Sequence, residues 1–402
     1  MTTNGDSGVV RKLAVRWEPS ATDSALQRPN FSGGEDLSVR ERKGIPELNK
    51  KFLQEMLRRE GRQVEVVSFT VVKGSEDNYS SSMIEVNLMT TDHDSISLLF
   101  KTVHVTPQEA KVLNVREMFK KEVLMYQKVV PTLIGLFPSD PLNVFTPSYH
   151  SHEDLLVFEN LRPLGFRHVD REQGLDLAHA NLVLTELGRL HGAAYVLHSR
   201  STEDAKALTD AGKEVLFTRH RKGVYQEGFA KISAETVEIL RENPKTRVHA
   251  DKVEAILARK YDILLELLRP KDDAINLLNH GDLWTGNLLF RYVYTHILDS
   301  AVNTDTSKKA VYNCHRQIRG PRRQSRNVWL VGDRYNDRPN KVPVQVVFLD
   351  LQLCRYGSPG LDVNYFLYTS TTARMREEHL DELLRTYHWS LVRTFRQLNA
   401  RA

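Results

Sequence analysis

One short stretch of this chain constrains its fold strongly, because its side chains can form one site only if the chain folds so that a distant residue lies beside them. The stretch from His280 to Asn287 reads His-Gly-Asp-Leu-Trp-Thr-Gly-Asn, and an apolar run at 346–349 later ends at Asp350. Phosphoryl transfer requires a carboxylate that accepts a proton, and an amide and a second carboxylate that bind magnesium. The pattern therefore predicts that Asp282, Asn287 and Asp350 meet at one site.

In this interpretation Asp282 is the general base, and Asn287 and Asp350 are magnesium ligands, since hard oxygen donors suit magnesium rather than zinc or copper. Each residue also has an ordinary explanation: a surface aspartate, a turn or helix cap, and a polar strand end. Their joint occurrence favours the functional interpretation. We expect His280 and Asp362 to hold backbone in place rather than to contact a substrate.

A second candidate pair lies earlier in the chain. Lys101 belongs to an apolar, strand-like run at 96–103, and Glu122 to a helical pattern at about 107–130. An ion pair between them would hold the ammonium group against nucleotide phosphates, as in kinases. Alternatively, both are solvated surface residues. The other charged residues on the same helix favour this alternative.

The order of the expected elements indicates an α+β protein. We expect a flexible arm at 1–45. Residues 46–161 carry a short helix, a long helix and strand-like runs, the first three at 64–72, 83–89 and 96–103. Helices dominate residues 162–402, most clearly at 175–197, 234–241 and 250–268. A nucleotide would bind between a β-rich and a helical part.

Composition is that of an ordinary globular protein of 402 residues. No apolar run approaches the roughly 18 residues of a spanning helix, and the start lacks the pattern of a secretion signal. Two cysteines are too few for a disulfide framework. We therefore expect a cytoplasmic protein with reduced thiols and no membrane partner.

The positive charge is local. Residues 291–341 hold eleven Lys or Arg and four Asp, whereas the whole chain has a net charge of +5. We predict that 293–342 is a disordered basic insertion, or the product of a misjudged exon boundary. A loop of this length beside a metal ligand is unusual and can impair activity. A nucleic-acid partner is not expected, because it would require basic residues spread over a folded face.

The sequence resembles the ecdysteroid kinase-like family, which is related to choline kinases and aminoglycoside phosphotransferases and is found chiefly in insects. The similarity extends over roughly 46–395 and rests on the blocks at 280–287, 348–352 and 355–362. Supporting matches lie at 76–81, 101, 119–122 and 158–161.

The resemblance implies a two-lobed, protein-kinase-like fold with a small β-rich N-lobe and a larger helical C-lobe. It implies Mg²⁺- and ATP-dependent phosphorylation of a small-molecule alcohol, either an ecdysteroid-like steroid or a foreign compound that is being detoxified. By matching position, Asp282 would be the base, Asn287 and Asp350 the metal ligands, and Lys101 with Glu122 the phosphate-positioning pair.

The same resemblance implies a hinge beside adenine, with Glu159, Asn160 and Leu161. From its residues, the polar turn after residue 73, with Ser75, Asn78, Tyr79 and Ser80, can also supply hydrogen-bond donors to the nucleotide phosphates. The turn lacks a glycine-rich or Walker pattern, so an ordinary hairpin turn explains its residues equally well. The chain stops at Ala402, before the closing helices that we expect of such proteins.

Two other functions are compatible with the residues. A catalytically inactive nucleotide- or ligand-binding pseudokinase would use the same scaffold. A nucleic-acid binder would use the basic residues at 308–341, although few aromatic residues lie among them. The sequence identifies neither the acceptor alcohol nor the oligomeric state.

Overall fold

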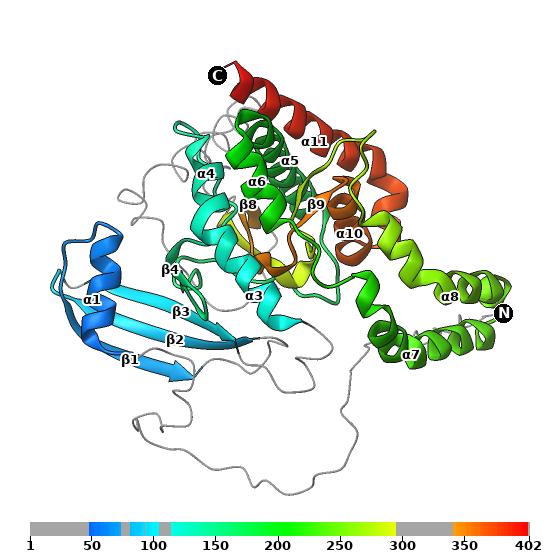
Figure 1. Ribbon diagram of the computed structural model, residues 1–402, viewed down its shortest axis with the longest axis horizontal. Helices are drawn as coiled ribbons and strands as arrows, with labels where there is room; N and C mark the ends of the chain where they lie inside the picture. Colours follow the sequence, from blue (N-terminus) through cyan, green and yellow to red (C-terminus); the bar gives the residue numbers. More distant parts are fainter. Residues whose placement is uncertain (1–47, 74–80, 93, 104–113, 295–340, 401–402) are drawn as a thin grey trace, which may run out of the picture. The chain divides into compact units, whose positions relative to one another are not determined.

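An antiparallel sheet forms the first part of the structure, a computed structural model that describes residues 48–73, 81–92, 94–103, 114–294 and 341–400 (Figure 1). The predicted N-terminal arm, the turn residues Ser75, Asn78, Tyr79 and Ser80, and all but the ends of the 293–342 insertion lie outside these ranges. All described residues belong to one compact unit, 44–402.

The sheet has five strands in the order β1-β2-β3-β5-β4. Their bounds are β1 (Val66–Lys73), β2 (Ser81–Thr90), β3 (Ser95–Val103), β4 (Ser148–His152) and β5 (Leu155–Glu159). Lys101 lies on the central strand β3, opposite Met83 of β2 and Leu156 of β5. A central strand is held by ladders on both sides, so it provides a rigid base for a functional side chain.

Helix α1 (Lys50–Arg59) covers one face of this sheet (Figure 1). Its N-cap is Asn49, whose side chain accepts a hydrogen bond from the Phe52 N–H. Its buried residues Leu53, Met56 and Leu57 join the buried residues of the strands in one apolar cluster. The spacing of these three residues is that of one helix face. The sequence pattern predicted a face of Leu48, Phe52 and Met56 or Leu57, and Leu48 and Phe52 are only partly buried against the cluster.

The long helix predicted at 107–130 is only partly described. It begins in the described residues as α3 (Val115–Leu124), continues through a π-helical turn, η1 (Met125–Val129), and ends as α4 (Val130–Gly135). The predicted end at 130 was therefore wrong. Pro131 lies in the first turn of α4, where a missing N–H is tolerated, so the proline does not end the helix.

Helices dominate the rest of the chain. They are α5 (Leu177–Arg200), α6 (Thr202–Ala211), α7 (Lys222–Glu242), α8 (Ala250–Leu267), α10 (Gly360–Ser370) and α11 (Ala373–Asn399). The predicted helix at 234–241 is only the second half of α7, because Gly223 and Gly228 weaken the helical signal before it. The α+β class and the protein-kinase-like order, a β-rich part before a helical part, are confirmed.

Two short antiparallel sheets of two strands each flank the residues of interest in this helical part. Strand β6 (Leu277–Asn279) pairs with β9 (Arg355–Gly357), and β7 (Leu288–Tyr294) pairs with β8 (Lys341–Phe348). Together they hold the segment that follows β6 next to the segment that follows β8. Within the described ranges, no helix combines the length and the hydropathy needed to cross a bilayer.

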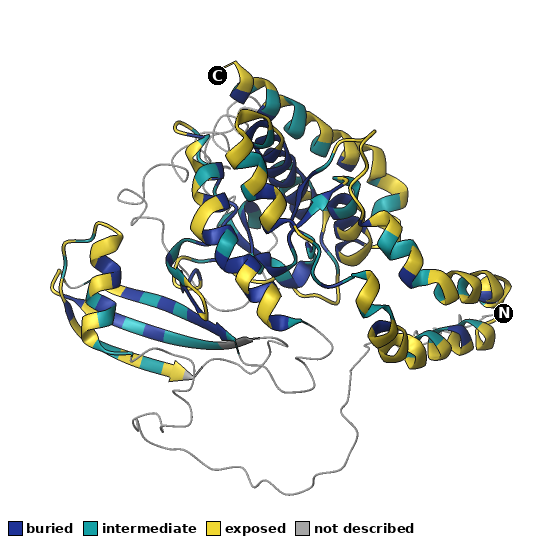
Figure 2. Ribbon diagram, viewed as in Figure 1, coloured by how far each residue is buried: buried dark blue, intermediate teal, exposed yellow. Residues whose placement is uncertain are grey.

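Helix α5 is the buried centre of the helical part, and Figure 2 shows it dark blue over most of its length. It packs along α11 at two glycines. A Cβ atom on Gly188 would lie 2.6 Å from the Tyr387 carbonyl oxygen, and one on Gly192 would lie 2.9 Å from the Leu391 carbonyl oxygen. The two backbones therefore approach so closely that a methyl group does not fit between them.

We predict that Gly188→Ala lowers the free energy of unfolding by about 1–3 kcal/mol, since the overpacked methyl group must push α5 and α11 apart. Gly228→Ala is the matched control: Gly228 is also helical, is exposed, and has open space within 4 Å of the position that a Cβ atom would take. The free energy of unfolding of Gly228→Ala should be about 0.5–1 kcal/mol higher than that of wild type, because alanine has a higher helix propensity than glycine. Urea titration of both variants measures the difference, and equal effects of the two changes would contradict the packing argument.

Candidate active site

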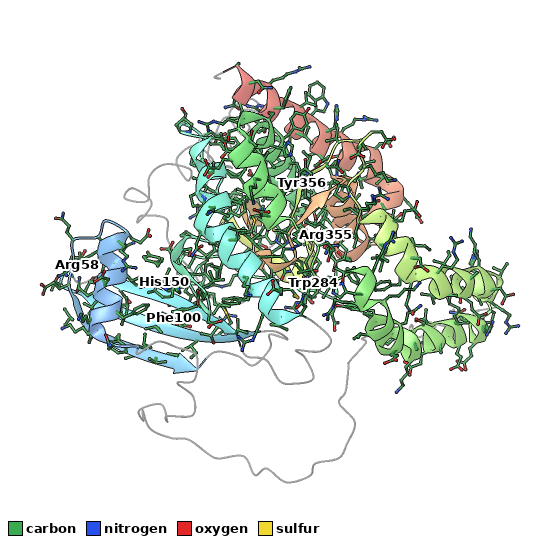
Figure 3. All side chains as sticks on the ribbon, viewed as in Figure 1. Arg58, Phe100, His150, Trp284, Arg355 and Tyr356 are labelled. Atoms are coloured by element: carbon green, nitrogen blue, oxygen red, sulfur yellow. The ribbon has the colours of Figure 1, made fainter. Side chains whose placement is uncertain are left out.

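The loop between β6 and β7 is built around a glycine that no other residue can replace without strain. Gly281 has φ 83°, and a Cβ atom there would lie 1.9 Å from the Leu353 carbonyl oxygen. This tight approach presses the loop against the segment that follows Asp350. Trp284 and Arg355 mark the two segments in Figure 3.

Asp362, at the start of α10, holds the same loop by accepting hydrogen bonds from the backbone of the loop. Its fully buried carboxylate accepts hydrogen bonds from the His280 N–H at 2.6 Å and the Gly281 N–H at 2.8 Å, and it lies 3.3 Å from His191 Nε2. Burial favours the neutral acid, but His191, His280 and the Gly281 N–H outweigh it and lower the pKa of Asp362. Asp362 therefore stays ionised and fixes the loop, as expected from the sequence.

His280 ties the loop to the end of β8. Its Nε2 lies 2.9 Å from the Leu349 carbonyl oxygen, and the side chain is buried. Leu349 in turn donates its N–H to the Asn287 carbonyl oxygen at 2.9 Å. These two bonds bring the residue before Asp350 against both ends of the 280–287 loop.

Asp282 is held by two donors. The side-chain nitrogen of Asn287 lies 2.9 Å from Asp282 Oδ2 and 2.9 Å from its carbonyl oxygen. The hydroxyl group of Tyr365 donates to Asp282 Oδ1 at 2.7 Å. Because its nitrogen is engaged, the amide oxygen of Asn287 is the atom that can face a cation.

Asp350 stands at the end of β8 in a left-handed conformation, with φ 64° and ψ 74°. Such a conformation is costly for a residue other than glycine and is found often at functional sites. Oδ2 of Asp350 accepts from Gln352 Nε2 at 3.0 Å, and Oδ1 accepts from Lys101 Nζ at 2.8 Å. The strained backbone turns the carboxylate towards the sheet residue Lys101.

Lys101 also donates to Glu122 Oε2, at 2.6 Å. Burial opposes the charge on Lys101, but the carboxylates of Asp350 and Glu122 together outweigh burial and raise the pKa of the lysine. Glu117, one of the other charged residues of the same helix, pairs with Lys120 on the exposed side of α3. The structure thus brings Lys101, Glu122 and Asp350 together.

A buried lysine that sequence reasoning did not single out joins α3 to the same region. Lys121 donates to the Cys354 carbonyl oxygen at 2.5 Å, and burial lowers the pKa of Lys121 to about 8. Next to Glu122 in sequence, it fixes α3 against the residues that follow Asp350. No periodicity distinguishes such a lysine from a solvated one.

The expected hinge residues lie where β5 ends. Glu159 is the last residue of β5, and Asn160 bonds through its side chain to Ser97 Oγ at 3.0 Å and to the Arg162 N–H at 3.1 Å. Leu161 is buried in a small apolar cluster with Phe166, Leu289 and Val347. Asn160 therefore shapes the turn, while Leu161 belongs to a buried apolar cluster with residues of β7 and β8.

The donor set fits magnesium. In the described part of the chain, no group of three or more His, Cys, Asp and Glu gathers as a metal site. Magnesium is commonly bound by only one or two protein ligands together with substrate phosphates. The Asn287 amide oxygen and the Asp350 carboxylate, next to each other through Leu349, meet that requirement.

Comparisons with known proteins add a family match. A profile described as the ecdysteroid kinase-like family matches residues 75–305 and 334–400, and the gap lies inside the predicted basic insertion. No match was found among curated proteins.

Among solved structures, the chain is similar to macrolide 2′-phosphotransferase MphH from Brachybacterium faecium, as apoenzyme. The identity is 13%, the TM-score 0.36, and the match covers 87% of this chain and 88% of that chain. It is also similar to aminoglycoside phosphotransferase APH(2″)-Ib with ADP bound. There the identity is 12%, the TM-score 0.35, and the match covers 86% of this chain and 85% of that chain.

We predict that Asp362→Asn lowers the free energy of unfolding at pH 7 by about 3 kcal/mol, since hydrogen bonds to a buried charge are lost or weakened. The native pKa of Asp362 lies below the ordinary 3.8, so its stabilisation is present above that pH and is lost as the pH falls through the native pKa. The difference in the free energy of unfolding between wild type and variant should thus stay constant from pH 7 to 5 and become smaller below pH 3.8.

Denaturant titration at each pH measures this gap, with Asp272→Asn in an exposed turn as the matched control. A gap that is equally large for the control, or that widens in acid, would show that the Asp362 carboxylate does not hold the loop.

Proposed function

Because the chain belongs to the ecdysteroid kinase-like family, a family of small-molecule kinases, we propose that it transfers the γ-phosphoryl group of ATP to a hydroxyl group of a small molecule. The acceptor is an ecdysteroid-like steroid or a hydroxylated foreign compound, whose phosphorylation serves detoxification. The need for ATP fits the cytoplasmic location expected from the sequence.

The observation that carries the proposal is the contact of the buried Lys101 side chain with both Glu122 and Asp350. A lysine ammonium has three N–H donors, and two of them have carboxylate partners here. The third can reach a phosphate oxygen. Glu122 on α3 and Asp350 after β8 thus hold one positive charge at a fixed place, where it would orient the nucleotide phosphates.

In this proposal Asp282 accepts the proton of the acceptor hydroxyl. The acceptor O–H bond breaks, a bond forms between its oxygen and the γ-phosphorus, and the bond from that phosphorus to the ADP oxygen breaks. A loose transition state demands alignment more than a strong base. The two donors on Asp282, from Asn287 and Tyr365, supply this alignment.

Asn287 and Asp350 would hold Mg²⁺, which neutralises charge on the phosphates when bound. Leu161 and the apolar residues around it would pack against adenine, and Glu159 with the backbone at Asn160 would contact its polar edge. Ser75, Asn78, Tyr79 and Ser80 are proposed to cover the phosphates from the turn after β1, whose geometry lies outside the described residues.

We predict that Asp282→Asn reduces the kcat of phosphoryl transfer from Mg·ATP by about 10²–10⁴-fold, because the amide cannot accept the acceptor proton. Transfer to ecdysone and to a panel of hydroxylated plant metabolites is measured by the mass gain of one phosphate. Asp272→Asn, in an exposed turn, is the matched control and should retain full activity.

Turnover of Asp282→Asn at the wild-type rate would reject the assignment of the base. A wild-type chain that binds Mg·ATP but phosphorylates no alcohol in the panel would instead identify the inactive, ligand-binding alternative.

A separate prediction concerns the metal. Asp350→Asn should raise the Mg²⁺ concentration needed for half-maximal ATP binding by at least about tenfold. The reason is that, of the two proposed protein ligands, the charged one is lost. Isothermal titration of ATP at a series of Mg²⁺ concentrations measures this, with Asp272→Asn as the control. An unchanged Mg²⁺ dependence in Asp350→Asn would mean that the cation binds elsewhere.

A further inference from the structure

Tyr365 is a residue at the site that no sequence pattern indicated. It lies on α10, and its hydroxyl group donates to Asp282 Oδ1 at 2.7 Å, although 83 positions separate the two residues. The residue is 41% exposed, so the contact lies at the surface of the site and is not sealed inside the core. A substrate hydroxyl group can therefore approach the same carboxylate.

Helix α10 is fixed to the loop that carries Asp282. Three residues before Tyr365, Asp362 accepts the N–H groups of His280 and Gly281, and its own N–H donates to Asn279 Oδ1 at 3.3 Å. Residues three apart in a helix lie on the same face. One turn of α10 thus holds the loop backbone through Asp362 and the loop side chain through Tyr365.

The carboxylate of Asp282 is therefore held from both sides. Asn287 donates to Oδ2 at 2.9 Å and Tyr365 to Oδ1 at 2.7 Å. A carboxylate oxygen has two lone pairs, so each oxygen keeps one for a further donor. Two donors on different elements fix the rotation of the group about its terminal bond, which is otherwise soft.

The tyrosine remains a donor over the range of pH in which a kinase works. Burial, and after it the charge of Asp282, raise the pKa of Tyr365 above its ordinary value. The hydroxyl proton therefore stays on the tyrosine, and Tyr365 neither supplies nor removes a proton during transfer.

We propose that Tyr365 is a positioning residue: its hydroxyl group holds the Asp282 carboxylate in the orientation in which the free lone pair of Oδ1 accepts the proton of the acceptor alcohol. This inference rests on the proposed function, in which Asp282 is the base. It adds α10 to the elements that align the reaction, and it assigns to Tyr365 a part in catalysis and none in ATP binding.

The test is Tyr365→Phe, which removes one oxygen and keeps the ring. Its matched control is Tyr368→Phe, one turn later on α10, where the residue is 70% exposed and its ring lies under the Arg376 guanidinium at 4.6 Å. With Mg·ATP and ecdysone, or water as acceptor in a phosphate-release assay, kcat of Tyr365→Phe should fall by about 10–100-fold, the range for a hydrogen bond to a charged group.

Two further readouts separate positioning from a merely structural role. The KM for ATP of Tyr365→Phe should stay within about twofold of wild type, because the tyrosine contacts the base and not the nucleotide. Tyr368→Phe should match wild type in both kcat and KM.

The outcomes are distinguishable from those for the proposed function. If Asp282→Asn is inactive while Tyr365→Phe keeps the wild-type kcat, the positioning role is wrong and the base assignment stands. A Tyr365→Phe variant that loses thermal stability, and in which the KM for ATP rises as kcat falls, also overturns it. If wild type transfers phosphate neither to ecdysone, nor to any hydroxylated plant metabolite of the panel, nor to water, both proposals fail.

Discussion

The ion pair between Lys101 and Asp350, at 2.8 Å, is the contact on which the rest of the site depends. It joins the central strand of the sheet to the end of β8, across 249 positions of sequence. The Lys101 ammonium is buried, whereas the Asp350 side chain is 28% exposed. Removing a carboxylate partner of a buried ammonium leaves part of its charge uncompensated. Glu122 on α3 provides the second negative charge, so three elements must be in place before Lys101 is balanced.

A second buried charge organises the loop on the other side of Asp350. Asp362 holds the backbone of His280 and Gly281, while His280 holds the Leu349 carbonyl oxygen. The base candidate Asp282 and the metal candidates therefore occupy positions that are set by backbone contacts around them. Preorganised side chains of this kind are what phosphoryl transfer requires, because alignment supplies most of its acceleration.

Part of this arrangement could be predicted from the sequence. The motif at 280–287 and the strand ending at Asp350 carried enough residue types to indicate one site, and the pair Lys101 and Glu122 followed from an apolar strand and a helix. The meeting of Lys101 with Asp350 could not be predicted from spacing, because it depends on how the sheet packs against the helical part. Tyr365 and Lys121 carried no signal, since a helical tyrosine or lysine resembles any core or surface residue.

If Lys101 and Asp350 act on one bound nucleotide, a double-mutant cycle tests this most directly. The affinity for Mg·ATP is measured by calorimetric titration of wild type, Lys101→Met, Asp350→Asn and the double variant. We expect that the two single losses are not additive, with a coupling of about 1–3 kcal/mol, the range for residues in contact. Strictly additive losses, or undiminished affinity in both single variants, would contradict a shared role at the nucleotide.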